Sequence, residues 1–158
     1  MDFGLARTKL MYPGKEIYDI AVANEGTHGY IPPEGYVYPT PLSKSVDLER
    51  YDSFAIGITI LRWLVAKRYG WRDKEKPGRY MEKDAVEISK YWSKKYEDNR
   101  KILDRDGLLM VSHVGWMMIQ KDPMHRATVL DAFEALKGAL KERKSGRVAL
   151  DVFKKWEK

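Results

Sequence analysis

The apolar stretch FAIGITILRWLVA, from Phe54 to Ala66, constrains the fold of this chain more than any other segment. It is too short to cross a bilayer and it contains Arg62, so a buried helix is the better interpretation. On a helix from Tyr51 to Lys67, the apolar residues cover nearly the whole circumference. This pattern predicts a helix that is buried on most sides and needs other elements packed around it.

Further helices are expected at Lys83–Leu103, Leu108–Gln120 and Thr128–Glu142, and the tail VALDVFKKWEK is compatible with a short fifth. Glycines and prolines exclude long helices from residues 1–40. Thr128 is a candidate N-cap for the helix that follows it. In two of the helices, apolar residues recur at helical spacing along one face: Ile88, Tyr91, Trp92 and Tyr96 in the first, and Val129, Leu130, Phe133, Leu136 and Leu140 in the last. No segment reads as a β-strand, so the predicted fold class is mainly α.

Composition narrows the possible functions of the chain. The 158 residues predict one domain, and the absence of cysteine excludes disulfides and cysteine-bound zinc. The formal charge is +6, but acidic residues interrupt nearly every basic run, so solvated helix faces are favoured over a nucleic-acid surface. No signal peptide or transmembrane segment is recognisable, which predicts a cytoplasmic or nuclear protein without a membrane partner.

Five short motifs follow one another along the chain, and their order and spacing are more informative than any one of them. They are DFG at Asp2–Gly4, GTHGYIPPE at Gly26–Glu34, DSFAIG at Asp52–Gly57, WRD at Trp71–Asp73 and DPMHRAT at Asp122–Thr128. With these motifs the chain resembles the C-terminal part of a eukaryotic-type serine/threonine protein kinase domain, from DFG onward.

The resemblance covers residues 2 to 142 and implies the domain organisation. Residues 1–142 would form a partial kinase domain, with an activation segment at 2–34 and the helical C-lobe at 35–142. Residues 143–158 would form a basic C-terminal tail. The implied fold is an activation segment followed by four to five helices, with the N-lobe and the catalytic loop absent.

The resemblance assigns roles near the N-terminus. It implies that Asp2 binds Mg²⁺, a task suited to a carboxylate, while Phe3 packs inward and Gly4 permits a turn. The alternatives are a solvated aspartate and ordinary loop residues. Three residues of the second motif would form the platform for a substrate peptide: Gly26, Thr27 and Tyr30. Thr27 also favours serine/threonine over tyrosine specificity, although a turn threonine is an alternative.

Four further residues receive structural roles. The resemblance implies a largely buried bidentate contact between Glu34 and Arg126, against the alternative of two unrelated surface charges. Asp52 would brace the catalytic loop, or would act as an N-terminal carboxylate that the helix dipole favours. Gly57, in the same motif, would be structural.

Three elements of a complete kinase are missing from the sequence: the glycine-rich nucleotide loop, the strand lysine and the H-R-D-x-x-x-x-N catalytic loop. The chain alone is therefore predicted to be inactive and to bind no cofactor tightly, with Mg²⁺ and ATP implied only for a full-length parent. The simplest explanation is that Met1 is not the true start. The expected partner is a protein, either as substrate of the parent or, alternatively, as partner of a non-catalytic, kinase-derived binding module.

Overall fold

A computed structural model of the chain describes residues 27–36, 48–70 and 82–144. These residues are mainly helical, and none of them lies in a β-strand, in agreement with the predicted fold class. The predictions for Asp2, Phe3, Gly4 and Gly26, for the WRD motif and for a helix in the tail concern residues outside the described ranges.

The predicted apolar helix is present and is longer than expected. It consists of α2 (Leu48–Thr59), the π-helical segment η2 (Ile60–Ala66) and α3 (Lys67–Tyr69), which follow one another without a break. Most of its large apolar side chains are buried, including Phe54, Ile58 and Leu61. Ile56 and Trp63 are 39% and 61% exposed, so one side of the helix faces solvent.

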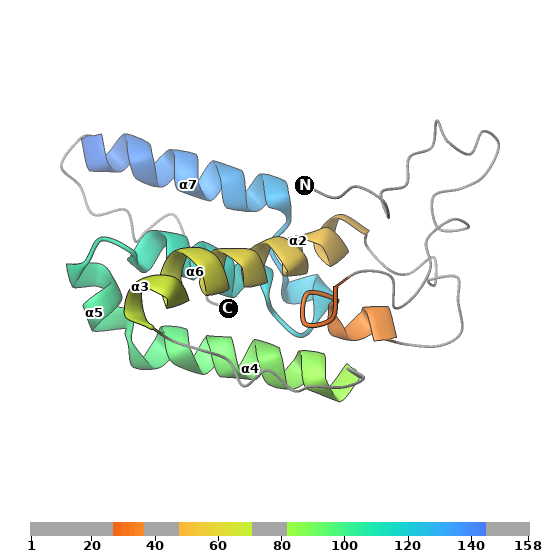
Figure 1. Cartoon of the computed structure of the whole chain (residues 1–158). Coiled ribbons are helices and arrows are strands. Elements are labelled where there is room, and N and C mark those ends of the chain that lie inside the picture. Colours follow the sequence, from red (N-terminus) through yellow and green to blue (C-terminus); the bar gives the residue numbers. More distant parts are fainter. Residues whose placement is uncertain (1–26, 37–47, 71–81, 145–158) are drawn as a thin grey trace.

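The other helices lie beside this one and leave one of its sides uncovered (Figure 1). They are α4 (Glu82–Asp98), α5 (Arg100–Arg105), α6 (Leu109–Met118) and α7 (Val129–Lys144), with short 3-10 turns η1 (Pro33–Tyr36) and η3 (Pro123–His125). In the view of Figure 1, α7 lies along one edge and α4 along the opposite edge, with α2 and α6 between them. The stretch predicted as one helix at Lys83–Leu103 is divided at Asn99 between α4 and α5.

Helix α6 is buried on both of its sides and connects two apolar clusters. One cluster joins α2, η2 and α4 through Phe54, Leu61, Trp92 and Tyr96. The other lies between α6 and α7 and contains Val114, Met117, Met118, Ala127, Ala132 and Ala135. The predicted apolar face of α4 is confirmed, because Trp92 and Tyr96 are almost fully buried.

Helix α6 approaches α2 and η2 closely at two glycines. A Cβ atom added to Gly57 would lie 2.7 Å from the Met118 Cβ, and one added to Gly115 would lie 2.9 Å from the Leu61 Cγ. These distances are too short for a side chain. Gly57 therefore has a packing role in this structure.

We predict that Gly57→Ala lowers the free energy of unfolding by about 1–3 kcal/mol, since the overpacked core must shift although alanine favours the helix. Urea denaturation measures the change. Thr59→Ala, an exposed position on the same helix, serves as the control and is expected to change stability by less than about 0.5 kcal/mol. An unchanged or higher stability of Gly57→Ala would contradict the close packing.

Helix α7 begins as predicted but buries a different face. The Thr128 Oγ1 accepts a hydrogen bond from the Asp131 N–H at 3.1 Å, and an Asp131 carboxylate oxygen accepts one from the Thr128 N–H at 3.2 Å. This reciprocal pair caps the helix. The predicted apolar face is correct only for Leu136, which packs partly against the core, because the other side chains packed against α6 are Ala132 and Ala135. The side chain of Leu140 lies outside the described part of the chain. Small alanines let α7 lie close to α6 and leave three large apolar residues exposed: Val129, Leu130 and Phe133.

Candidate functional site

The segment from Thr27 to Tyr36 forms an exposed turn followed by a buried anchor. The Tyr30 N–H donates a hydrogen bond to the Thr27 carbonyl at 3.0 Å and closes the turn. Gly29 has φ 85°, a left-handed conformation that glycine adopts at little cost. Thr27 and His28 are exposed, whereas the Ile31 side chain and the two prolines after it are buried. The turn therefore lies at the surface, and the buried residues that follow it anchor it to the core.

Two side chains from η2 hold the turn in place. The Arg62 guanidinium lies over the Tyr30 ring, 4.8 Å from its centroid, in a cation–π contact. The Trp63 indole N–H donates to the Tyr30 hydroxyl at 3.3 Å. Arg62 also lies so close to Gly29 that a Cβ there would be 3.2 Å from a guanidinium nitrogen. The Thr27–Ile31 turn is thus held by the Arg62 guanidinium and the Trp63 indole.

The helical segment that supplies this support is a π-helix, a rare conformation that is frequent at functional sites. Its wider turn changes the angular spacing of side chains relative to an α-helix. Arg62 and Trp63 are neighbours in sequence, yet both contact Tyr30. This part of η2 is consequently the link between the buried helix and the exposed turn.

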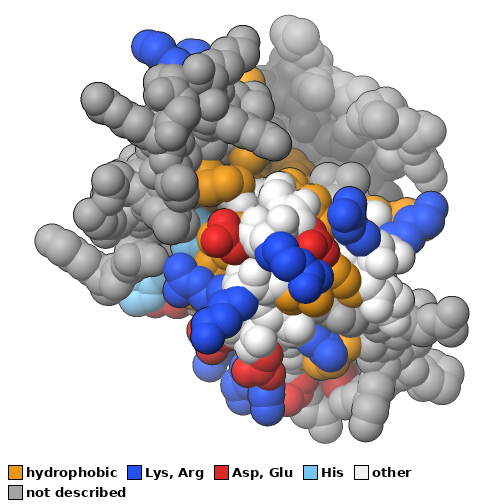
Figure 2. Space-filling view, turned by 90° about the vertical axis from the view of Figure 1, so that its left-hand side faces the viewer, with side chains coloured by type: hydrophobic (Ala, Val, Ile, Leu, Met, Phe, Trp, Pro, Cys, Tyr) orange, Lys and Arg blue, Asp and Glu red, His pale blue; other side chains and the backbone are white. Residues whose placement is uncertain are grey.

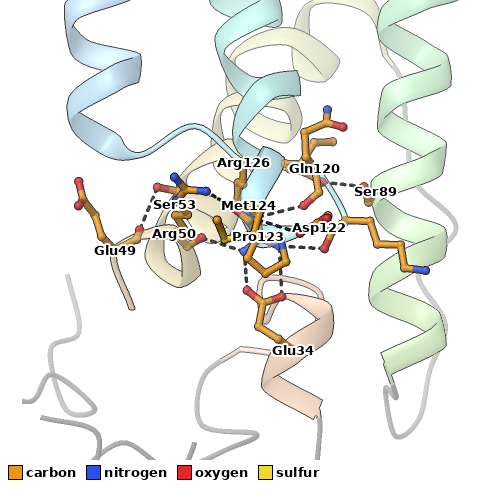
Figure 3. A network of polar contacts seen from close by, with 12 residues as sticks. Glu34, Glu49, Arg50, Ser53, Ser89, Gln120, Asp122, Pro123, Met124 and Arg126 are labelled. Carbon is orange, nitrogen blue, oxygen red and sulfur yellow. Dashed lines mark hydrogen bonds and ion pairs between the residues drawn. The ribbon is translucent and has the colours of Figure 1, made fainter. Parts of the chain in front are cut away.

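Arg126 is the centre of a second network, which joins distant parts of the chain (Figure 3). Its side chain is fully buried and donates five hydrogen bonds. The acceptors are the two carboxylate oxygens of Glu34, at 2.5 and 3.2 Å, and the main-chain carbonyls of Arg50, Gln120 and Lys121. The guanidinium also lies over the Phe54 ring, 5.1 Å from its centroid. Every N–H of the guanidinium therefore has an acceptor, which is what a buried arginine requires.

Contacts around Arg126 fix the link between α6 and α7. The Arg50 guanidinium donates to the Pro123 carbonyl at 2.7 Å. The Asp122 carboxylate accepts from the Met124 N–H at 2.9 Å and caps η3. On the other side, the buried Ser89 hydroxyl donates to the Ile119 carbonyl at 2.6 Å. The DPMHRAT motif is thus a rigid link that positions Arg126.

The structure brings some of the predicted site residues together and separates others. Glu34 and Arg126, 92 positions apart in sequence, form the bidentate contact that the resemblance implies. Thr27 and Tyr30 belong to one turn. Asp52 is exposed and lies in the second turn of α2, because that helix begins at Leu48 rather than at Tyr51.

The late position of Asp52 corrects one expectation. Glu49, not Asp52, is the acidic residue of the first turn of α2, and the helix dipole acts mainly within that turn. Partial burial raises the pKa of the Asp52 carboxyl, although much of its side chain remains exposed. The helix dipole therefore gives Asp52 little stabilisation in this structure.

Sequence reasoning missed the residues that support the two networks. Arg62 and Trp63 were seen only as part of an apolar helix, and Arg50 and Phe54 had no predicted contact with Arg126. Phe54 belongs to the motif DSFAIG, so the sequence singled it out without indicating its contact with Arg126. Nothing in the sequence marks η2 as a π-helix.

Two chemical features are absent from the described ranges. No group of three or more His, Asp or Glu side chains in this part of the chain could hold a metal ion. None of the helices described is both long enough and apolar enough to span a membrane.

A scan against protein-family models, a search of curated proteins and a search of solved structures each find no match to this chain. The function is therefore inferred from the motifs and from the contacts described above.

Proposed function

We propose that this chain is the C-terminal part of a serine/threonine-type protein kinase. The full-length parent would transfer the γ-phosphate of Mg-ATP to serine or threonine residues of proteins. Asp2 would bind Mg²⁺ in that parent, and the turn that contains Thr27 and Tyr30 would carry the substrate peptide. The chain alone lacks the residues for the chemical step.

The contact between Glu34 and Arg126 carries the proposal. The resemblance implies this contact between the end of GTHGYIPPE and the arginine of DPMHRAT, two motifs that are far apart in the sequence. Two surface charges that were unrelated would show neither a bidentate geometry nor a guanidinium with 0% exposure. The buried pair thus favours the interpretation of the motifs as one constellation.

The Thr27–Ile31 turn gives independent support. A platform for a substrate must expose its polar residue and hold its backbone firmly. Thr27 is exposed, while Tyr30 is held by Arg62 and Trp63 and the following residues are buried. These properties suit a surface over which an extended peptide lies.

The charge distribution favours a protein over a nucleic acid as partner. On the face shown in Figure 2, Lys and Arg side chains are interspersed with Asp and Glu side chains. Exposed residues of α4 and α5 include both signs within a few positions, for example Glu97, Asp98, Arg100 and Lys101. A backbone-binding surface for nucleic acid needs a continuous basic patch instead.

The purified chain is expected to transfer no phosphate, because it contains neither the base aspartate nor the phosphate-pairing lysine. An assay with radiolabelled ATP, Mg²⁺ and a generic serine/threonine peptide measures this directly. Phosphate transfer that co-purifies with the chain and is lost in Asp2→Asn would overturn the prediction. A complete kinase treated in the same way is the positive control.

The rival function is a non-catalytic binding module derived from a kinase, which acts through a partner protein. The exposed side of the apolar helix, with Ile56 and Trp63, favours this candidate because such surfaces mark contact sites. Immunoblotting of the native protein with an antibody against the C-terminal tail discriminates between the two. A band well above 18.4 kDa supports the kinase parent, and a band at that mass supports the binding module.

A further inference from the structure

Helix α7 carries an exposed apolar patch formed by Val129, Leu130 and Phe133. Leu130 is 64% exposed and Phe133 is 58% exposed, whereas Ala132 and Ala135 on the opposite side of the helix pack against α6. α7 itself lies along one edge of the fold in Figure 1. Two large, neighbouring apolar side chains in water are unfavourable and mark a contact surface.

Charged residues are distributed unevenly along the same helix. Its N-terminal half contains only acidic charges, Asp131 and Glu134, whereas its C-terminal half is basic on balance, with one acidic residue, Glu142, among Lys137, Lys141, Arg143 and Lys144. The Glu134, Lys137 and Lys141 side chains are exposed, like the apolar patch. A second helix with the same distribution would be complementary only if it ran in the opposite direction, because each basic half would then face an acidic half.

We propose that α7 is a dimerisation surface, and that its occupant is the α7 of a second copy of this chain packed antiparallel to it. The arrangement is isologous, so each copy presents the same patch to the other. Leu130 and Phe133 would form the apolar centre, with Lys137 and Lys141 directed toward the acidic half of the partner helix. In the antiparallel arrangement the positive end of each helix dipole also lies near the negative end of the other, which is favourable.

The expected affinity follows from the size of the surface. A helix of 16 residues is about 24 Å long, and one such helix pair falls at or below the lower end of the roughly 1,200–2,000 Å² typical of stable interfaces. Dimerisation is therefore expected with a dissociation constant in the micromolar range. This proposal does not depend on the proposed kinase function.

Sedimentation velocity of the full chain tests the proposal between about 1 and 300 µM, a range that brackets a micromolar dissociation constant. The wild-type chain is expected to change from monomer to dimer with concentration. Leu130→Glu and Phe133→Glu are each expected to raise the dissociation constant at least about tenfold, as for residues at the centre of an interface. Met124→Glu is the matched control on an exposed apolar side chain outside α7, and it should dimerise like the wild type.

A charge-reversal experiment tests the direction of packing. Glu134→Lys replaces the exposed acidic side chain in the N-terminal half of α7 with a basic one, and the double variant Lys137→Glu/Lys141→Glu reverses two exposed lysines in its C-terminal half. Each variant alone is expected to remain monomeric, and an equimolar mixture is expected to form a heterodimer. Circular dichroism of every variant establishes that the helices are intact.

A wild-type chain that stays monomeric up to the highest concentration overturns the proposal and leaves the patch to a different occupant. Dimers that persist in both Leu130→Glu and Phe133→Glu overturn the assignment to α7. A mixture of the two charge variants that does not associate overturns the antiparallel arrangement.

Discussion

Replacing Arg126 with methionine is expected to lower the free energy of unfolding by about 3–5 kcal/mol, the usual cost of breaking a buried ion pair. Methionine retains much of the side-chain volume but donates none of the five hydrogen bonds. The Glu34 carboxylate, whose side chain is 14% exposed, would be left without its cation. The carbonyls of Arg50, Gln120 and Lys121 would also lose their common donor. Arg126→Lys should fail to restore stability, because one ammonium cannot reproduce a planar fork.

Urea denaturation with a matched control checks this result. Arg105→Met removes a guanidinium that is 71% exposed and paired with Asp106, so it is expected to cost about 1 kcal/mol or less. In a double-mutant cycle, Arg126→Met and Glu34→Gln should be strongly non-additive, since both break the same contact. Equal effects of Arg126→Met and Arg105→Met would show that Arg126 is not the centre of a buried network.

Acidification is expected to destabilise the protein through His113. This side chain is buried between α4 and α6, where its Nδ1 lies 2.6 Å from the Tyr96 hydroxyl and shares a hydrogen bond with it. Trp116 packs against its ring. Burial, together with the positive charge of Arg100, lowers the pKa of His113 from 6.5 to about 4. The neutral imidazole is therefore the form that the folded protein accommodates.

The sign of the pH effect follows from proton binding. The unfolded chain binds a proton at His113 near pH 6.5, whereas the folded chain binds it only near pH 4. The contribution of His113 to stability is thus fully present above pH 6.5 and is lost as the pH falls toward 4. The shift corresponds to a maximum loss of about 3 kcal/mol.

Urea denaturation of the wild type and of His113→Gln at several pH values between 7.5 and 4.5 measures this contribution. Glutamine keeps a hydrogen-bond partner for Tyr96 but does not titrate in this range. The variant is expected to lose less stability on acidification than the wild type. His125→Gln, whose side chain is 75% exposed, is the control for the replacement of an imidazole by an amide. Parallel pH profiles for wild type and His113→Gln would contradict the burial of a neutral His113.

Much of the fold could be predicted because the relevant signals are local. The apolar run around Phe54 allows little except a buried helix, and the Thr128 cap follows from a hydroxyl placed before an apolar helix. The contact between Glu34 and Arg126 is long-range, and periodicity carries no information on it. It was expected only because the motifs that contain these residues resemble those of one family.

Other features could not be predicted because they depend on how the helices pack. The α7 pattern indicated that its large apolar residues form the core face, but Ala132 and Ala135 allow the closer approach to α6 and are buried instead. The π-helical segment is defined by its main-chain hydrogen bonds, and the amino-acid composition of the segment does not indicate them. Without it, the contacts of Arg62 and Trp63 with Tyr30 could not be inferred.

Phosphate transfer by the native protein tests the proposed function most directly. The protein is immunopurified from its source and incubated with Mg²⁺, radiolabelled ATP and a mixture of protein substrates. We expect labelled phosphoserine and phosphothreonine, their loss in a parent that carries Asp2→Asn, and their retention with Asp104→Asn at an exposed position of α5. A native protein that transfers no phosphate, or transfer that Asp2→Asn leaves unchanged, would contradict the assignment to a serine/threonine kinase.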